Sequence, residues 1–271
     1  MRRADTSLNL RRFEEGEGSE VLVLLHGLGG THRYWTCGPM PFSVPNHRRV
    51  LVDLLGFGAS PRPWMRYTLE RHLEALDVTL AREGRVTLVG HSLGAALALA
   101  YAARWPERVV RLILISPPCF QGVGGAAAWF ARQRGGWVYT NLWATALACL
   151  ITRRIAGRLL PRLLADMPRE VAEDLVAHNM ASSTTSLWDV IYRHDLQQDA
   201  AALRSDIPVL LIHGDRDTTA PPDGTRLLAA GRQSWRLEML QGRDHHPWLR
   251  APQECLDRVA SWLSASPPEP A

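Results

Sequence analysis

Residues 86–99, VTLVGHSLGAALAL, join a short aliphatic run to an alanine-rich run through a turn with a serine between two glycines. The first run has the length and composition of a buried strand, and the second has the composition of a helix. A serine at so sharp a strand-to-helix turn is forced into a strained backbone conformation, and side chains at Gly90 and Gly94 would collide with neighbouring chain. We expect this turn to hold the Ser92 hydroxyl out above one edge of a sheet.

Further aliphatic runs of strand length recur along the chain, at residues 21–25, 50–52, 112–115, 209–212 and 237–240. They are apolar throughout rather than alternating, which is typical of parallel strands buried on both faces. Helical patterns lie between several of them, with leucines on one face in 69–80 and apolar residues on one face in 256–263. The sequence therefore predicts an α/β fold with a mainly parallel central sheet flanked by helices.

The alternation of strands and helices stops between Ile115 and Val209, where the sequence has helical patterns and no convincing buried strand. We therefore predict an α/β core domain formed by residues 1–118 and 199–271, with a helical lid inserted at 119–198. The lid begins in a stretch with the prolines and glycines of a flexible boundary. Its aromatic residues either pack the lid onto the sheet domain or line an apolar pocket.

The composition is that of a folded globular protein, and every one of its 31 basic residues is arginine. The arginines occur as scattered pairs without a long basic stripe, so we expect no nucleic-acid partner. The four cysteines lie far apart, which favours reduced thiols over a zinc site or disulfides. No signal peptide is evident, and the most hydrophobic segment, 142–151, is too short to cross a bilayer. We expect a cytoplasmic protein with no stable membrane insertion.

Three motifs resemble those of the α/β-hydrolase family, and the resemblance extends over residues 21–263. The turn GHSLG, residues 90–94, is similar to the G-x-S-x-G turn that carries the family's serine nucleophile. The segment HGLGG, residues 26–30, is similar to the family's oxyanion loop, and DLLGFGAS, residues 53–60, to a structural turn of the family. The helical lid after the sixth strand is also typical of this family.

The resemblance implies that Ser92 is the nucleophile and that the backbone N–H groups of Leu28 and Leu93 form the oxyanion hole. Leu93 begins the expected helix, where unpaired N–H donors and the helix dipole favour negative charge. A serine hydroxyl is a poor nucleophile without a base that accepts its proton. A histidine and an orienting acid must therefore come from elsewhere in the chain.

Two aspartates in HGDRD, residues 213–217, could supply the acid. The family's usual G-x-x-D spacing favours Asp217, whereas Asp215 is expected to stabilise the turn. The chain order of serine, acid and histidine is then that of the family's triad.

Two histidines after the last predicted strand could supply the base, His245 and His246. The family's base usually precedes a proline by seven positions, and counting back from Pro252 favours His245. His246 would then line the mouth of the site. Asp244 stands where the family commonly has glycine, so the loop departs locally from the family's pattern.

Six residues are assigned to the substrate-binding surface: His26, Gly27, His91, Trp129, Trp143 and His246. His26 and His91 flank backbone features, so packing or loop orientation is the alternative role for both. The other histidines fit no metal-ligand spacing, and the glycine-rich loop 27–30 lacks the third glycine of GxGxxG. We predict that the protein uses no cofactor and no metal.

The resemblance implies a serine hydrolase, of the carboxylic ester hydrolase class, that acts through an acyl-enzyme intermediate. The apolar lid favours a small to medium hydrophobic ester, thioester or lactone as substrate. The same residues serve C–C bond hydrolases and acyl transferases of the family, and a non-catalytic ligand-binding protein is a further alternative. The expected partner is a small hydrophobic acyl substrate, and the sequence does not indicate the oligomeric state.

Overall fold

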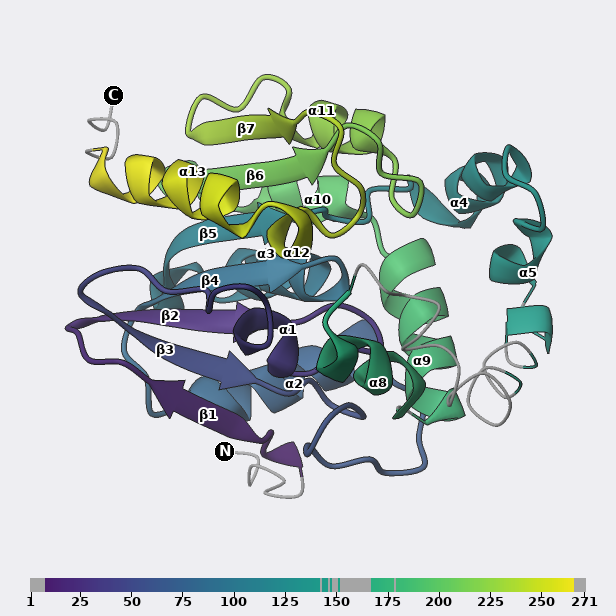
Figure 1. Cartoon of the computed structure of the whole chain (residues 1–271), viewed down its shortest axis with the longest axis horizontal. Helices are drawn as coiled ribbons and strands as arrows, with labels where there is room; N and C mark the ends of the chain where they lie inside the picture. The colour runs from purple at the N-terminus through teal and green to yellow at the C-terminus, as the bar shows by residue number, and fades with distance from the viewer. Residues whose placement is uncertain are drawn as a thin grey trace.

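A computed structural model of the chain describes residues 8–141, 143–145, 147, 151, 167–177 and 179–265. Within these residues, seven strands form one sheet in the order β1-β3-β2-β4-β5-β6-β7 (Figure 1). The strands are β1 (Arg12–Glu15), β2 (Glu20–Leu25), β3 (His47–Val52), β4 (Val86–His91), β5 (Val109–Ile115), β6 (Val209–Gly214) and β7 (Trp235–Leu240). Each neighbouring pair is parallel except β1 and β3. The predicted α/β class with a mainly parallel sheet is confirmed.

Strand β1 was not predicted, because its sequence RFEE has neither an aliphatic run nor a clean alternation. It pairs antiparallel with β3 at the edge of the sheet. Edge strands are often short and carry charged side chains, so they need no aliphatic run. Strand β3 also begins earlier than its aliphatic residues do. Its polar start, His47 to Arg49, is half-exposed, while Val50 to Val52 are fully buried.

Helices cover both faces of the sheet, and each face has its own hydrophobic core. One face packs against α2 (Leu69–Leu80), α3 (Leu93–Arg104), α10 (Leu196–Ala202) and α11 (Pro222–Ala229). The other packs against α1 (Arg33–Thr36), α8 (Arg169–Ala177), α12 (Pro247–Arg250) and α13 (Pro252–Ser264), which lie toward the viewer in Figure 1. A short 3-10 helix, η2 (Pro106–Arg108), joins α3 to β5.

The predicted insertion contains helices beyond β5 rather than strands in its described part. They are α4 (Gly122–Ala131), α5 (Trp137–Thr140), α8, α9 (Met180–Ser186) and the π-helix η4 (Leu187–Tyr192). The end of the insertion is not detached from the core, because residues 190–192 are buried in the same cluster as α3. Helix α10 begins at Leu196, before the predicted boundary at 199, and packs on α3. The domain limits and the lid role remain predictions.

Within the described ranges, none of the helices combines the length and the apolar composition needed to cross a bilayer. Of the hydrophobic segment 142–151, residues 142, 146 and 148–150 lie outside the described residues.

Candidate active site

The turn between β4 and α3 has the strained geometry that its sequence predicts. Ser92 has φ of 50° and ψ of −113°, a conformation that costs a non-glycine residue about 1–3 kcal/mol. A Cβ atom on Gly90 would overlap the carbonyl of Gly94, and one on Gly94 would overlap the carbonyl of Leu25. The Ser92 N–H donates to the carbonyl of Ile115 at 2.9 Å, which fixes the turn to the neighbouring strand. Only glycines at 90 and 94 permit this arrangement.

Asp217 is anchored by both carboxylate oxygens just beyond the end of β6. Its Oδ1 accepts hydrogen bonds from the N–H groups of Thr219 at 2.7 Å and Ala220 at 2.9 Å. Its Oδ2 accepts one from His245 Nδ1 at 2.7 Å and lies 2.9 Å from His213 Nε2. The side chain is completely buried, so its position is set by these four contacts.

The charge state of Asp217 follows from the same contacts. Burial by itself would raise the pKa of this carboxyl group, but the charges of His245 and His213 and their hydrogen bonds outweigh it. The pKa of Asp217 is therefore held well below its usual range. The carboxylate stays ionised throughout the pH range in which a histidine titrates.

Hydrogen bonds join the loop after β6 to the end of β7 and the loop that follows it. They bring Asp217 and His245 close together. The Asp215 N–H donates to the carbonyl of Leu240 at 3.1 Å, and Asp215 Oδ1 accepts from Gly242 N at 2.6 Å. Asp215 is thus bonded to the end of β7 and the loop after it, whereas Asp217 is bonded to His245. Asp244, at the family's glycine position, accepts from the His246 N–H at 2.9 Å.

His245 and Ser92 line one cavity of about 730 Å³ at the carboxyl edge of the sheet. The His245 ring lies 5.0 Å from the His91 ring, which belongs to the residue before the serine. His91 Nε2 donates to the His245 backbone carbonyl at 2.9 Å and so links the serine turn to the histidine loop. Burial, together with the charges of His245 and His246, lowers the pKa of His91 well below its ordinary value, so this ring is neutral.

His246 lines the cavity beside His245 but has a different environment. Burial first, and then the charge of His245, lowers the pKa of His246 to about 3, even though the nearby Asp244 and Asp217 act in the opposite direction. A ring with such a pKa is uncharged near neutral pH. His246 is suited to forming the cavity wall, and it is the His245 ring that contacts the carboxylate.

The glycine-rich loop 27–30 also lines the cavity, with Leu28 in its middle. A Cβ atom on Gly27 would lie 2.7 Å from His91 Nδ1, so the loop can pack this closely only with glycine there. Leu93, the first residue of α3, is completely buried and can contribute to the site only through its backbone. Its N–H occupies the helix start, where the helix offers no intrahelical acceptor.

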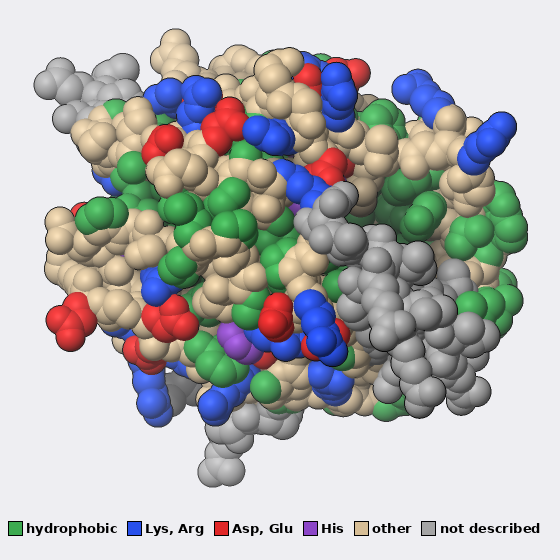
Figure 2. Space-filling view, in the orientation of Figure 1, with side chains coloured by type: hydrophobic (Ala, Val, Ile, Leu, Met, Phe, Trp, Pro, Cys, Tyr) green, Lys and Arg blue, Asp and Glu red, His purple; other side chains and the backbone are tan. Residues whose placement is uncertain are grey.

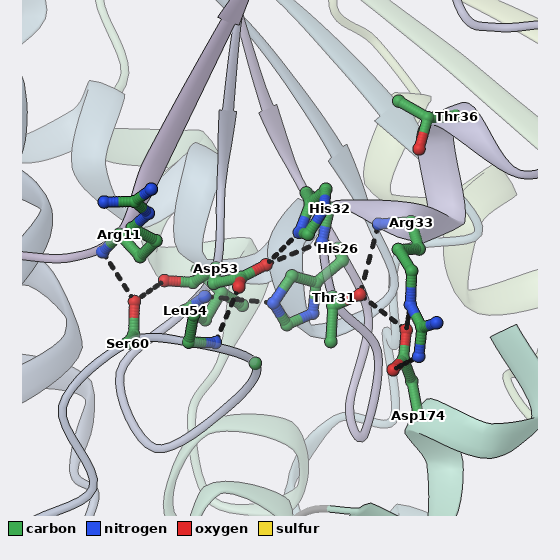
Figure 3. A network of polar contacts seen from close by, with 12 residues as sticks. Arg11, His26, Thr31, His32, Arg33, Thr36, Asp53, Leu54, Ser60 and Asp174 are labelled. Atoms are coloured by element: carbon green, nitrogen blue, oxygen red, sulfur yellow. Dashed lines mark hydrogen bonds and ion pairs between the residues drawn. The ribbon is translucent and has the colours of Figure 1, made fainter. Parts of the chain in front are cut away.

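A buried polar network around Asp53 supports the glycine-rich loop (Figure 3). Asp53 Oδ1 accepts from the His32 N–H at 2.7 Å and from its ring at 3.0 Å, and Oδ2 accepts from the Ala59 N–H at 2.8 Å. Burial would raise the pKa of Asp53, but His32, the charge of His26 and these N–H donors together lower it. An ionised Asp53 thereby secures the DLLGFGAS turn against the loop.

The structure places His26 in this network rather than at the cavity. Its Nε2 accepts from the Leu54 N–H at 2.9 Å, so Nδ1 carries the proton and donates to the carbonyl of Gly27 at 2.7 Å. Burial lowers the pKa of His26 despite the nearby Asp53. Both ring nitrogens are occupied by backbone groups and the residue is completely buried, so the expected substrate contact is corrected to loop orientation.

The insertion supplies much of the cavity wall, but through residues other than the two tryptophans assigned to it. Its wall is mainly apolar and aromatic and includes Phe120, Phe130, Val138, Tyr139, Leu187 and Tyr192. Trp129 instead donates from Nε1 to the carbonyl of Thr218 at 3.1 Å, and Trp143 is 82% exposed. Neither tryptophan is among the lining residues, because Trp129 is bonded at the rim and Trp143 faces outward.

Sequence reasoning missed His213 and a polar contact between loop and insertion. His213 lies at the end of β6. Its Nδ1 is hydrogen-bonded to Thr225 Oγ1 at 2.8 Å, and its Nε2 lies 2.9 Å from Asp217 Oδ2. Asp174 of α8 accepts from Thr31 Oγ1 at 2.5 Å and pairs with the Arg33 guanidinium (Figure 3). A polar residue ending an otherwise aliphatic strand was the available signal for His213. No local pattern marked Asp174.

Both the sequence and the fold of this chain are similar to those of known proteins. Residues 22–258 match the sequence model of the alpha/beta hydrolase family. The chain is similar to the probable lysophospholipase BODYGUARD 1 of Arabidopsis thaliana, with 28% identity over 88% of this chain and 57% of that protein. It thus spans about half the length of the curated plant relatives that it matches.

Solved structures are similar over nearly the whole chain. A hydrolase from Pseudomonas aeruginosa PA01 is 26% identical with a TM-score of 0.75, covering 94% of each chain. The enol-lactonase from Burkholderia xenovorans LB400 is 24% identical with a TM-score of 0.71, covering 94% of this chain and 96% of that one. The latter similarity shows a common fold.

Proposed function

Since the chain belongs to the alpha/beta hydrolase family, we propose that it is a serine hydrolase with the triad Ser92, His245 and Asp217. One observation carries the proposal: His245 bonds the buried Asp217 at 2.7 Å and lines the same cavity as Ser92. A histidine anchored by a carboxylate in this way can act as the base for a neighbouring serine. The strained turn that carries Ser92 supports the same role.

In the acylation step, Ser92 Oγ attacks the acyl carbonyl carbon while His245 Nε2 accepts the hydroxyl proton. The bond to the leaving oxygen then breaks, and His245 returns the proton to the leaving alcohol. The acyl group remains on Ser92 until water, activated by the same histidine, releases it as the acid. General base catalysis of this kind contributes about 10² to 10⁴-fold in rate.

Asp217 supports the step in two ways. Its bond to Nδ1 selects the tautomer of His245 that leaves Nε2 free to accept a proton. Its negative charge also stabilises the imidazolium that forms during attack. Because the pKa of Asp217 is held well below its usual range, the carboxylate keeps that charge while His245 cycles between its two states.

The N–H groups of Leu28 and Leu93 would receive the oxyanion. They come from the glycine-rich loop and from the start of α3. Each donor of this type lowers the barrier by about 3 kcal/mol in other serine hydrolases. The network of Asp53, His32 and His26 would hold the first donor in place without reorganisation.

The cavity favours a hydrophobic acyl substrate. Its volume of about 730 Å³ lies in the range of small-molecule sites, and its outer wall is aromatic and aliphatic. The plant relative is named a probable lysophospholipase, which supports an ester with one long acyl chain. We propose a hydrophobic carboxylic ester of this kind as the substrate class.

Active-site labelling tests the proposal. A fluorophosphonate should modify the protein stoichiometrically at Ser92. Ser92→Ala should abolish this labelling and lower the rate of p-nitrophenyl ester hydrolysis by at least about 10³-fold. Labelling or turnover that survives in Ser92→Ala would place the nucleophile elsewhere.

A substrate screen then resolves the reaction type. Acyl esters of increasing chain length, lactones and vinylogous diketones should be tested with identification of the products. Release of a carboxylic acid and an alcohol supports the ester hydrolase. Carbon–carbon cleavage of the diketone, or transfer of the acyl group to an added alcohol, would reassign the chemistry while keeping the triad.

A further inference from the structure

A group of large apolar side chains stays exposed on the first half of the insertion. We call it the outer apolar surface, and its members are Val123, Trp137, Tyr139, Trp143, Leu147 and Ile151. Trp143 is 82% exposed and Trp137 is 65% exposed, although tryptophan is normally buried for most of its area. Figure 2 shows hydrophobic side chains gathered on the side of the molecule that carries α4 and α5. Exposed apolar groups that cluster in this way mark interaction sites.

The sequence around this surface carries positive charge without compensation. Residues 120–141 contain two arginines, Arg132 and Arg134, and no aspartate or glutamate. Arg132 and Arg134 are exposed, and neither pairs with an acidic residue in the described part of the chain. Arg66, in contrast, forms an ion pair with Asp189 at 2.5 Å. The partner of the outer apolar surface is therefore expected to be negatively charged.

The outer apolar surface is continuous with the cavity through Tyr139. This residue is 51% exposed and also lines the cavity, so the cavity reaches the surface there. Phe130 stacks on Tyr139 with ring centroids 5.1 Å apart, and the Phe120 ring lies 5.6 Å from the Phe130 ring. These three rings form a continuous aromatic wall of the cavity that begins at the exposed surface.

We propose that the outer apolar surface docks on an anionic lipid bilayer and opens the cavity to lipid esters held there. Tryptophan side chains prefer the interfacial region of a bilayer, and arginine can keep its charge among headgroups while its stem covers apolar area. A basic and aromatic surface of this type binds in the plane of the interface without spanning it. The delivery of substrate rests on the proposed hydrolase function, whereas the docking does not.

A second copy of the chain is a poorer occupant. A two-fold contact on this surface would place Arg132 and Arg134 of both copies, four positive charges, in one interface. Like charges in an interface repel and cost binding energy, and no acidic side chain in this stretch offsets them. Anionic headgroups would instead neutralise the arginines while the acyl region accepts the indoles.

Vesicle sedimentation with the Ser92→Ala protein tests docking without lipid turnover. It should bind vesicles of equal parts phosphatidylcholine and phosphatidylglycerol, bind phosphatidylcholine alone more weakly, and lose affinity as salt is raised. The double substitution Arg132→Gln and Arg134→Gln should weaken binding about 30-fold, roughly fivefold for each arginine. Trp137→Ser with Trp143→Ser should weaken it at least about tenfold.

Matched controls come from the rest of the surface. Arg82→Gln with Arg85→Gln removes the same charge near the start of β4, at the opposite edge of the sheet, and Leu227→Ser removes an exposed apolar group from α11. Both should bind vesicles within about twofold of the parent. If the controls lose as much affinity as the arginine or tryptophan variants, the outer apolar surface is not the docking site.

Two further readouts keep docking and hydrolysis distinguishable. In the Ser92 protein, the tryptophan variant should hydrolyse a short soluble ester within about twofold of the parent. Vesicle binding without any ester hydrolysis would overturn the proposed function and leave docking intact. Hydrolysis with no vesicle binding, or light scattering that shows a dimer lost in the tryptophan variant, would overturn docking.

Discussion

The two sides of the cavity are held by different forces. On the sheet side, Asp217 is buried and both of its carboxylate oxygens accept hydrogen bonds. His91 links the serine turn to His245 through a further hydrogen bond. On the insertion side, Phe130 and Tyr139 meet through ring contacts, and Tyr139 is half-exposed. Catalytic groups need fixed geometry, which directional hydrogen bonds provide, whereas an acyl chain needs only apolar area of suitable shape. The difference teaches that chemistry and substrate choice can be changed separately.

The largest effect should come from the sheet side. Asp217→Asn removes the charge and the acceptor that select the tautomer of His245, so kcat for a short ester should fall about 10³ to 10⁴-fold. Asp215→Asn alters only the turn contact to Gly242 and should lower kcat less than about tenfold. Steady-state kinetics of both variants checks this. A larger loss in Asp215→Asn than in Asp217→Asn would assign the role of the acid to Asp215.

An intermediate effect should come from the insertion side. Leu187→Ala removes apolar area from the cavity wall, so kcat/KM for a long-chain ester should fall about tenfold while a short-chain ester changes less than about twofold. Leu227→Ala, the same change at an exposed position outside the cavity, is the control. Equal losses for both chain lengths would mean that Leu187 affects catalytic geometry rather than acyl binding.

A third effect concerns stability, at a contact between α2 and the insertion. His72 of α2 contacts Ser186 Oγ of α9 at 2.9 Å, and burial, together with the charge of His26, lowers its pKa to about 3. An unfolded histidine has a pKa near 6.5, so between these values the unfolded chain binds a proton that the folded chain does not. The free energy of unfolding should therefore fall as pH drops through this window.

His72→Asn isolates that contribution, because an amide can still bond Ser186 but does not titrate. Denaturant unfolding at pH about 7 and about 4.5 should show that the variant loses about 2 kcal/mol less stability between them than the parent. Identical losses would show that His72 does not carry this pH dependence.

Much of the sheet side could be predicted because its determinants are local. The aliphatic runs predicted six of the strands, and the steric demands of Gly90 and Gly94 predicted the turn that the structure contains. Strand β1 escaped prediction because an edge strand needs no apolar pattern. His26 was assigned to substrate because its sequence neighbours gave no sign that Leu54 would bond its ring.

The insertion side could be predicted only in outline. Its helical and aromatic character is visible in composition, but which aromatic residues face inward depends on how the helices pack. Trp143 and Tyr139 are separated by four positions, yet one faces outward and the other lines the cavity.

The sequence by itself determined the fold class, the strained serine turn and the candidates for acid and base, since these follow from hydrophobic pattern, steric limits and spacing along the chain. Only the tertiary structure decided that His213 lies beside Asp217 and that Asp174 connects the insertion to Thr31, which follows the glycine-rich loop. Each of these contacts joins side chains brought together from separate elements or set by loop conformation, so no local pattern encodes it.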